Sequence, residues 1–232
     1  MGINDLLIVK KILPIILKAQ SADSEGLRQL RRQLIVILDE VGHKNFVTIA
    51  ADVLKNNFKV EGCNDARVPL KRIFAVSLKE LEMDLASQSY NLSESHPLVF
   101  LTSDHKDNIE KLKALDLSVK NGPAKAKDFI SYYKDLDLHI RKEEEVFFPV
   151  LEACGMKEHP DNLKDEHKGF REILIEVTEK QNLSRFSDKF VPDICNHIFR
   201  ETYIFYPAAL EFIADKKQWD KIKEGFSLVD KQ

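Results

Sequence analysis

An internal repeat in the second half of the chain restricts the fold more than any other feature of the sequence. Residues 139–149 read HIRKEEEVFFP and residues 197–207 read HIFRETYIFYP, so that the His, Ile, Glu, Phe and Pro positions coincide. A shorter match lies upstream of each copy, where residues 104–106 read DHK and residues 166–168 read EHK. The repeated unit is predicted to be a pair of helices, and two copies of the pair predict a site with approximate two-fold symmetry.

The whole chain has the periodicity of helices. Gly and Pro are scarce, with 8 of each among 232 residues, and apolar residues recur at steps of three and four over long windows. Four helical segments are expected in the second part of the chain, at residues 98–120, 124–153, 160–180 and 186–214, followed by a short one near 216–224. The connections between them are short, which favours antiparallel neighbours. The sequence therefore predicts an all-α fold that contains an antiparallel up-down four-helix bundle.

The first part of the chain is also helical in pattern but carries no chemical motif. Helices are expected at residues 4–20, 24–41, 43–59 and 66–88. The polar stretch around residues 93–95 is the expected domain boundary. The predicted division is an N-terminal helical region of unassigned role at 1–92, the bundle at 96–215, and a short C-terminal helix with its tail at 216–232.

Composition argues against several classes of function. The formal net charge is -3, and the charged residues are spread along the chain, so no basic stripe is present for nucleic acid or an anionic membrane surface. No segment approaches the roughly 20 uninterrupted apolar residues that span a bilayer, and the N-terminus lacks the cleavage site of a secretory signal. Cys63, Cys154 and Cys195 form no C-x-x-C pair. We therefore expect no disulfide framework and a cytoplasmic location.

Each helix of the predicted bundle has a histidine in its apolar stripe. Residues spaced alternately three and four apart share one face of a helix. On this criterion the stripes of the second and fourth helices also contain a glutamate, one turn beyond the histidine. The candidate metal ligands are His105, His139, Glu143, His167, His197 and Glu201.

Groups of this kind gathered in one core require a metal. A buried unpaired carboxylate costs several kcal/mol, and an imidazole needs partners for both ring nitrogens. Metal coordination offsets this cost. Mixed His and carboxylate ligation inside a four-helix bundle suits iron or manganese, two carboxylates can each bridge a pair of ions, and the absence of thiolates argues against structural zinc. The pattern therefore predicts a centre of two metal ions.

Single parts of this pattern have ordinary explanations. A lone histidine in an apolar stripe is more often a hydrogen-bonded core residue, and one His-x-x-x-Glu pair also arises on a solvated face. Four histidines in successive helices and two copies of the pair favour the metal site. Arg141, Glu144 and Glu145 lie off the stripe and are expected to be solvated. Asp104 and Glu166 precede ligand histidines, and either lie at the surface or orient the ring of another ligand.

Two prolines follow the two glutamates at the same spacing. Pro149 and Pro207 each remove a backbone hydrogen bond one to two turns beyond Glu143 and Glu201. Two interpretations remain open for them. Either they end the two helices, or they bend them and widen the bundle around the site.

The signature H-x-x-x-E-E-x-x-x-F-P is formed here by His139, Glu143, Glu144, Phe148 and Pro149. It resembles the cation-binding HHE branch of the hemerythrin family, over about residues 96–215. The resemblance implies a carboxylate-bridged di-iron centre with an oxo or hydroxo bridge, for which manganese or zinc would be substitutes. It also implies reaction with a small diatomic ligand, O2 or NO, or with peroxide.

The chain departs from the oxygen-carrying members of that family. Those proteins have a second histidine in the third helix and an aspartate in the fourth, where this chain has Arg171 and Thr202. The set of four histidines and two glutamates is instead similar to that of the di-iron proteins that repair iron–sulfur clusters under stress. The segment around Cys63 does not reproduce the cysteine-containing N-terminal domain of those proteins.

Three functions follow from the resemblance. The leading one is a di-iron protein that reacts with O2, NO or peroxide, in stress response or iron–sulfur cluster repair; whether it turns over as an enzyme is left open. The alternative is a sensor of oxygen, nitric oxide or iron that signals through the N-terminal helices to a protein partner. Oxygen storage ranks last because of the ligand set.

Overall fold

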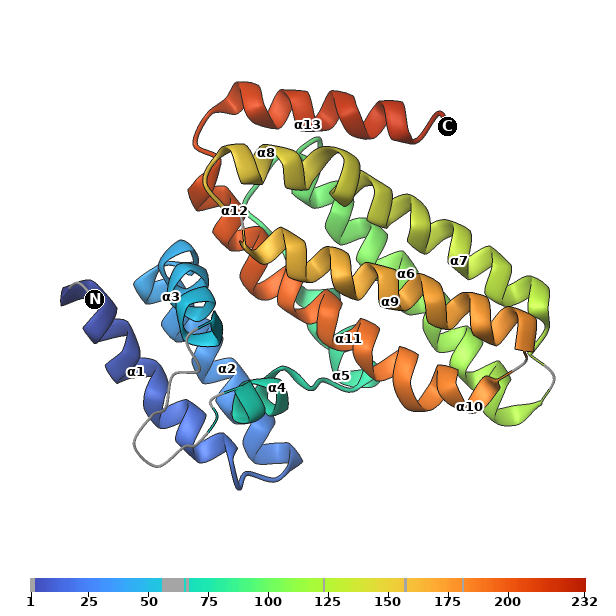
Figure 1. The fold of residues 1–232 in the computed structure, drawn as a ribbon, viewed down its shortest axis with the longest axis horizontal. Coiled ribbons are helices and arrows are strands. Elements are labelled where there is room, and N and C mark those ends of the chain that lie inside the picture. The colour runs from blue at the N-terminus through green and yellow to red at the C-terminus, as the bar shows by residue number, and fades with distance from the viewer. Residues whose placement is uncertain (1–2, 56–64, 66, 123, 157, 181) are drawn as a thin grey trace. The chain divides into compact units, whose positions relative to one another are not determined.

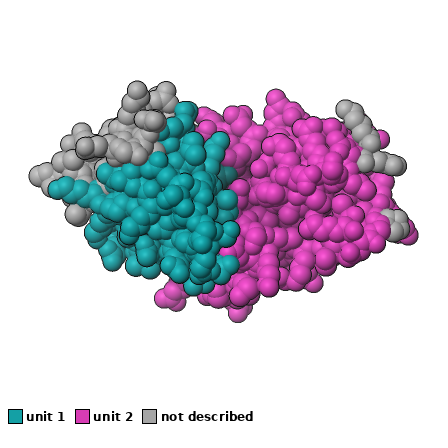
Figure 2. All heavy atoms as spheres, turned by 90° about the horizontal axis from the view of Figure 1, so that it is seen from below, with its two compact units in different colours: residues 1–75, 199–212 teal, residues 76–198, 213–232 magenta. Residues whose placement is uncertain are grey.

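The computed structural model describes residues 3–55, 65, 67–122, 124–156, 158–180 and 182–232. Within these ranges every regular element is a helix and no strand occurs, which confirms the predicted all-α class. The contacts divide the chain into two compact units, coloured separately in Figure 2. Unit 1 consists of residues 1–75 and 199–212, and unit 2 of residues 76–198 and 213–232. Among the described helices, none combines the length and the apolar character needed to cross a membrane.

Unit 2 is built around the predicted bundle, and its long helices are seen side by side in Figure 1. The first helix of the bundle is α6 (Pro97–Asn121) and the third is α9 (Glu158–Lys180). The second consists of α7 (Ala126–Arg141), η1 (Lys142–Phe147) and α8 (Phe148–Ala153). The fourth runs through α10 (Leu183–Arg185), η2 (Phe186–Phe190), α11 (Val191–Arg200), η3 (Glu201–Phe205) and α12 (Tyr206–Phe212). By their contacts, the last two of these elements belong to unit 1.

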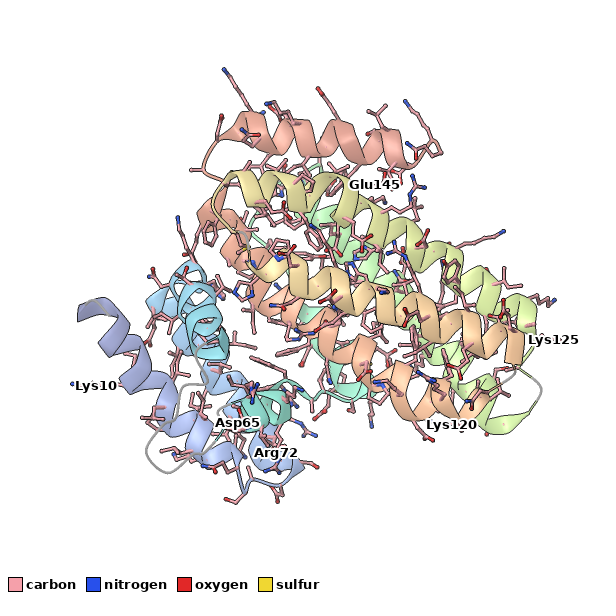
Figure 3. All side chains as sticks on the ribbon, in the orientation of Figure 1. Lys10, Asp65, Arg72, Lys120, Lys125 and Glu145 are labelled. Atoms are coloured by element: carbon pink, nitrogen blue, oxygen red, sulfur yellow. The ribbon has the colours of Figure 1, made fainter. Side chains whose placement is uncertain are left out.

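Aromatic side chains fill the end of the bundle where α6 turns into α7, which Lys120 and Lys125 mark in Figure 3. Phe129 meets Phe186 edge to face, with ring centroids 5.1 Å apart, and Tyr132 meets Phe190 in the same way at 5.9 Å. All four side chains are buried. Burying an aromatic side chain of this size stabilises a fold by about 1.5–3 kcal/mol. The apolar stripes predicted from the sequence therefore form a buried, aromatic core on this side of the polar centre.

Three π-helical turns interrupt the second and fourth helices. In η1, η2 and η3 the backbone hydrogen bond spans five residues, from Phe148 to Glu143, from Val191 to Phe186 and from Tyr206 to Glu201. Each turn ends two residues before a proline, in the sequences FFP, FVP and FYP. A proline has no N–H, and its ring clashes with the carbonyl four residues earlier, which a wider turn relieves. Pro149 and Pro207 therefore lie inside helices, and the interpretation that they end them is wrong.

Two helices of unit 2 lie outside the bundle, α5 (Leu78–Ser87) and α13 (Lys216–Val229). The sequence predicts a single helix over residues 66–88, but the structure has α4 (Arg67–Phe74) and then α5. The break has a local cause, because Ser77 and Glu80 form a capping box that starts α5. The Ser77 hydroxyl accepts the Glu80 N–H at 3.3 Å, and the Glu80 carboxylate accepts the Ser77 N–H at 3.1 Å. Helix α13 extends beyond the expected end at residue 224.

Helix α13 packs on η1 so closely that a glycine is required at the contact. A Cβ placed on Gly225 would overlap Cγ1 of Val146 and lie 3.3 Å from its Cβ, which cannot rotate away. Alanine favours a helix over glycine by about 1 kcal/mol, but overpacking costs about 1–3 kcal/mol.

We therefore expect Gly225→Ala to lower the free energy of unfolding, by about 1 kcal/mol after these opposing effects. Gly169 in α9 is the matched control, because a Cβ there meets nothing within 4 Å. Gly169→Ala should raise the free energy of unfolding by about 0.5–1 kcal/mol. Urea unfolding of the two variants measures both changes, and an equal gain in stability for both would contradict the close contact.

Unit 1 consists of α1 (Ile3–Ala19), α2 (Ser24–Val41), α3 (His43–Lys55) and α4, together with η3 and α12. The buried leucines of α2, Leu30, Leu34 and Leu38, recur at the helical spacing. Gly42, at φ 87°, ends α2 because this left-handed conformation suits only glycine without strain. Arg72, labelled in Figure 3, donates to the carbonyls of Ala19 and Ala22 and satisfies the end of α1.

The described cysteines carry free thiols. Cys63 lies outside the described residues, whereas Cys195 is fully buried and Cys154 is partly exposed. Burial, and to a lesser degree the charge of Asp116, raises the pKa of the Cys195 thiol to about 12. The thiol is therefore protonated near neutral pH, and a protonated thiol is a poor nucleophile.

We expect a thiol-alkylating reagent to leave Cys195 unmodified in the native protein at pH 7 and to modify it once the protein is unfolded. Peptide mapping by mass spectrometry distinguishes Cys195 from the other cysteines. Rapid modification of Cys195 in the folded protein would contradict its placement in the core.

Candidate metal centre

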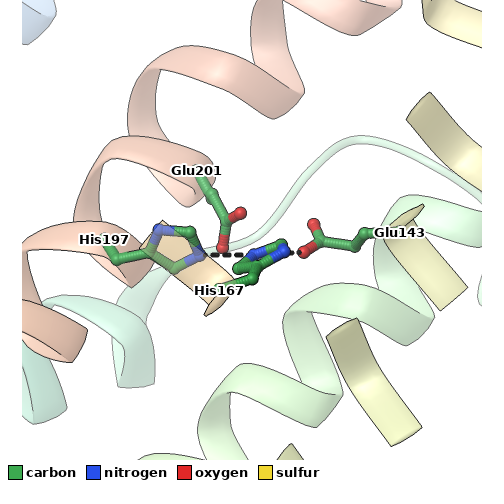
Figure 4. A group of neighbouring side chains, drawn as sticks. All are labelled: Glu143, His167, His197 and Glu201. Atoms are coloured by element: carbon green, nitrogen blue, oxygen red, sulfur yellow. Dashed lines mark hydrogen bonds and ion pairs between the residues drawn. The ribbon is translucent and has the colours of Figure 1, made fainter. Parts of the chain in front are cut away.

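The structure brings all six predicted ligands together in a buried cluster. None is more than 3% exposed. They come from α6, α7, η1, α9, α11 and η3, so that each helix of the bundle contributes. Their ligand atoms form two groups within which all atoms lie within 4.8 Å of one another. The first group is Glu143, His167, His197 and Glu201, drawn in Figure 4, and the second is His105, His139 and Glu201.

The imidazoles face one another in two pairs. Nε2 of His105 lies 3.1 Å from Nε2 of His139, and Nε2 of His167 lies 3.0 Å from Nε2 of His197. The carboxylate of Glu143 lies beside one member of each pair, with Oε2 3.6 Å from Nε2 of His139 and 3.4 Å from Nε2 of His167. The pairs follow the repeat in the sequence. Each pair combines a histidine from the first helix of one copy of the repeat with a histidine from the second helix of the same copy.

Carboxylates on the outside of the cluster hold the opposite nitrogen of three rings. Nδ1 of His197 lies 2.7 Å from Glu166, Nδ1 of His167 lies 3.0 Å from Glu144, and Nδ1 of His139 lies 3.5 Å from Asp104. An ionised carboxylate only accepts hydrogen bonds, so each Nδ1 must carry the proton. In the neutral ring, Nε2 then presents a lone pair to the centre of the cluster.

This donor set fits a metal. Two Nε2 lone pairs 3.0 Å apart repel each other unless a cation lies between them, and the two buried glutamates add negative charge at the same place. Imidazole and carboxylate ligands together suit iron, manganese or zinc. The ring centroid of Phe148 lies 5.9 Å from that of His167, and the ring centroid of Phe170 lies 5.0 Å from that of His197. Apolar rings therefore border the polar centre on the side of His167 and His197.

The structure resolves the role of the acidic residues next to the ligands. Asp104 and Glu166 each hold the ring of a histidine on another helix, which is one of the two alternatives open from the sequence. The expectation that Glu144 is solvated is wrong. Its carboxylate lies between His167 and Arg171, and although burial raises its pKa, these two partners outweigh burial and lower it. Arg171 also contacts Asp137, with Nε 2.7 Å from Oδ1.

No pattern in the sequence indicated a role for Lys142. In the structure this lysine is buried, at 8% exposure, and it lies next to Asp104, the residue that holds His139. Its Nζ lies 3.1 Å from Oδ2 of Asp104. Burial alone would lower its pKa, but Asp104 and Asp230 outweigh burial and the pKa is raised, so the side chain is charged. By contrast, Arg141 and the exposed Glu145 pair with each other at 2.7 Å, in agreement with the expected surface role.

A four-helix bundle with buried imidazoles and carboxylates facing its centre defines a metal-binding helical domain. Residues 96–209 match the family model of the hemerythrin HHE cation binding domain. This segment is therefore similar to the hemerythrin HHE cation binding domain, and it contains all six candidate ligands. No curated protein and no solved structure matches the chain.

Proposed function

We propose that this domain, over residues 96–215, binds two iron ions through His105, His139, Glu143, His167, His197 and Glu201. The observation that carries the proposal is the arrangement of these ligands in two groups that share Glu201. A carboxylate common to both groups suits a bridge between two ions. The ligand set contains no thiolate, which favours iron over structural zinc, although manganese or zinc would be substitutes.

We infer further that the loaded protein reacts with O2, NO or peroxide, in stress response or in repair of iron–sulfur clusters. Iron supplies redox chemistry when it is bound. The six candidate ligands would hold the ions, and Arg171 in the third helix adds no ligand because it is directed to Glu144 and Asp137. Positions therefore remain for a small exogenous ligand. Phenylalanine rings border the centre beside His167 and His197.

Elemental analysis and optical spectra of the purified protein, with and without air, test the proposal. We expect two irons per chain and the absorption of a bridged ferric pair in air. Protein that is free of iron after expression with iron, and that takes up none afterwards, would refute it. The reaction is tested by adding nitric oxide or peroxide to the loaded protein, and repair by adding a cluster enzyme damaged by nitric oxide.

A second candidate function is that of a sensor, and one observation favours it. Glu201 lies in η3, which continues directly from the helix that carries His197 but groups by its contacts with the N-terminal helices. In that unit η3 contacts α2 and α3. A change at the metal centre can therefore be passed to helices that would bind a protein partner.

Hydrogen exchange distinguishes the sensor from the leading function. Exchange in α2 and α3 should differ between the oxidised and the reduced iron-loaded protein if the sensor proposal holds. Identical hydrogen exchange in the oxidised and the reduced protein would refute the sensor function. Oxygen storage, the third function, predicts instead a reversible absorption change when oxygen is added and withdrawn.

A further inference from the structure

Helix α13 is held on the turn that carries one of the candidate ligands. Its apolar face, formed by Trp219, Ile222, Phe226 and Val229, is buried. The ring of Trp219 lies tilted against that of Phe147 of η1, with centroids 6.2 Å apart, and its indole N–H donates to the Ile213 carbonyl at 3.0 Å. Figure 1 shows α13 alongside α7 and α8, and its contacts are with η1 and α6. The helix lies beyond residues 96–209, the part that matches the family model.

A chain of charged groups runs from the end of α13 to a candidate ligand. Oδ1 of Asp230 lies 3.1 Å from Nζ of Lys142, which lies 3.1 Å from Oδ2 of Asp104. The same Asp104 oxygen lies 3.5 Å from Nδ1 of His139. Gln232 adds a second link at this end, because its side-chain oxygen accepts a hydrogen bond from Arg141.

Lys142 needs both carboxylates to keep its position. Its side chain is only 9% exposed, and a buried ammonium group is costly unless it is paired. A half-open cavity of about 200 Å³ lies beside it, lined by Asp104, His139 and Lys142 among others. This space allows Lys142 and Asp104 to turn away from the ring if Asp230 is lost.

The other imidazole contacts depend on different residues. His197 is held at 2.7 Å by Glu166 of α9, and His167 at 3.0 Å by Glu144, which Arg171 of α9 fixes in turn. The contact between His139 and Asp104 is the longest of the three, at 3.5 Å. Of the three histidines, His139 therefore depends most on the residues that hold its partner, the Asp104 carboxylate, in place.

We propose that Asp230 and Lys142 are positioning residues for His139, so that the C-terminal helix sets the metal affinity of the half of the centre formed by His105 and His139. The inference rests on the proposed function. Residues that orient a ligand ring typically contribute 10- to 100-fold in metal affinity. Because Asp230 acts through two intermediate groups, we expect about a tenfold effect, at the lower end of that range.

Anaerobic titration of the metal-free, full-length protein with Fe²⁺ tests the proposal. In Asp230→Ala one of the two ions should bind about tenfold more weakly, while the other binds as in the unaltered protein. Asp230→Glu should restore most of the affinity. The matched control is Asp220→Ala on the same helix, because exposed Asp220 pairs with Lys216, at 2.8 Å, and not with the chain of charged groups described above. This control should bind both ions normally.

A merely structural role gives a different pattern. If α13 only stabilised the fold, Asp230→Ala would lower the melting temperature of the metal-free protein and would lower the affinity for both ions equally. That result would overturn the proposal. Unchanged affinity of Asp230→Ala for both ions would overturn the proposal as well. Lys142→Met should weaken the binding of the same ion. The double variant Asp230→Ala/Lys142→Met should bind this ion no more weakly than either single variant, because both residues act through the same series of contacts. Failure of the unaltered protein to bind Fe²⁺ would refute the proposed function itself.

Discussion

Glu201→Ala is expected to purify with almost no iron, whereas His139→Ala is expected to retain one of two ions. The reason is that Glu201 belongs to both groups of ligand atoms, while His139 belongs to one. In the proposed centre, removing the shared carboxylate would take a ligand from each ion and also the negative charge that would offset the two cations. Elemental analysis of the purified variants gives the iron content per chain directly.

Two control substitutions test whether any loss is specific. Glu145→Ala removes a glutamate two residues from Glu143, but this side chain is 46% exposed and pairs with Arg141. His43→Ala removes a histidine of unit 1 that lies near Asp39 and Glu211. Both variants should retain two irons. Full iron content in Glu201→Ala, or equal losses in all four variants, would defeat the ligand assignment.

Removal of the ions by a chelator is expected to cause the largest change in stability. A ligand present at about 1,000 times its Kd stabilises the folded state by about 4 kcal/mol, so two ions contribute about 8 kcal/mol. A domain of ordinary size is stable by about 5–15 kcal/mol in total. The metal-free protein should therefore unfold at a much lower urea concentration, because four imidazoles and two carboxylates then face one another without cations.

Circular dichroism during urea unfolding, with and without chelator, measures this difference. Glu201→Ala provides the internal control, since a variant that binds no metal should unfold identically under both conditions. An iron-loaded protein whose unfolding midpoint is the same after chelation would show that the ions do not stabilise the bundle.

The helices and the positions of the six candidate ligands could be predicted because both depend on local spacing. A step of three or four residues places a side chain on the buried face of a helix, whatever the neighbouring helices are. The repeat then related the two halves, and the structure places His139 and His197 at equivalent positions in the two imidazole pairs. The match at residues 96–209 agrees with this interpretation.

The residues behind the ligands could not be predicted, because their roles depend on contacts between helices. Glu144 lies off the apolar stripe and has the sequence context of a solvated charge, yet it faces Arg171 of another helix. Lys142 and Asp230 are far apart in the sequence and meet only when α13 docks. No local pattern distinguishes such residues from ordinary surface charges.

The π-helical turns did have a signal in the sequence. An aromatic residue, any residue and then proline recur at 147–149, 190–192 and 205–207, each within a helical pattern that continues past the proline. A proline inside a long amphipathic pattern requires either a kink or a wider turn. The repetition of the sequence in three places would have favoured the wider turn.

A π-turn is an α-helix that has accommodated one additional residue. Deleting a single residue between Glu143 and Pro149 would return that turn to α-helical pitch without rotating the segments on either side, because the π-turn already absorbs the additional residue. The ring of Pro149 would then meet the carbonyl four residues earlier, a clash that costs about 3 kcal/mol in a regular helix. The additional residue and its proline therefore depend on each other, and a deletion between residues 143 and 149 should be tolerated far better when Pro149 is replaced as well.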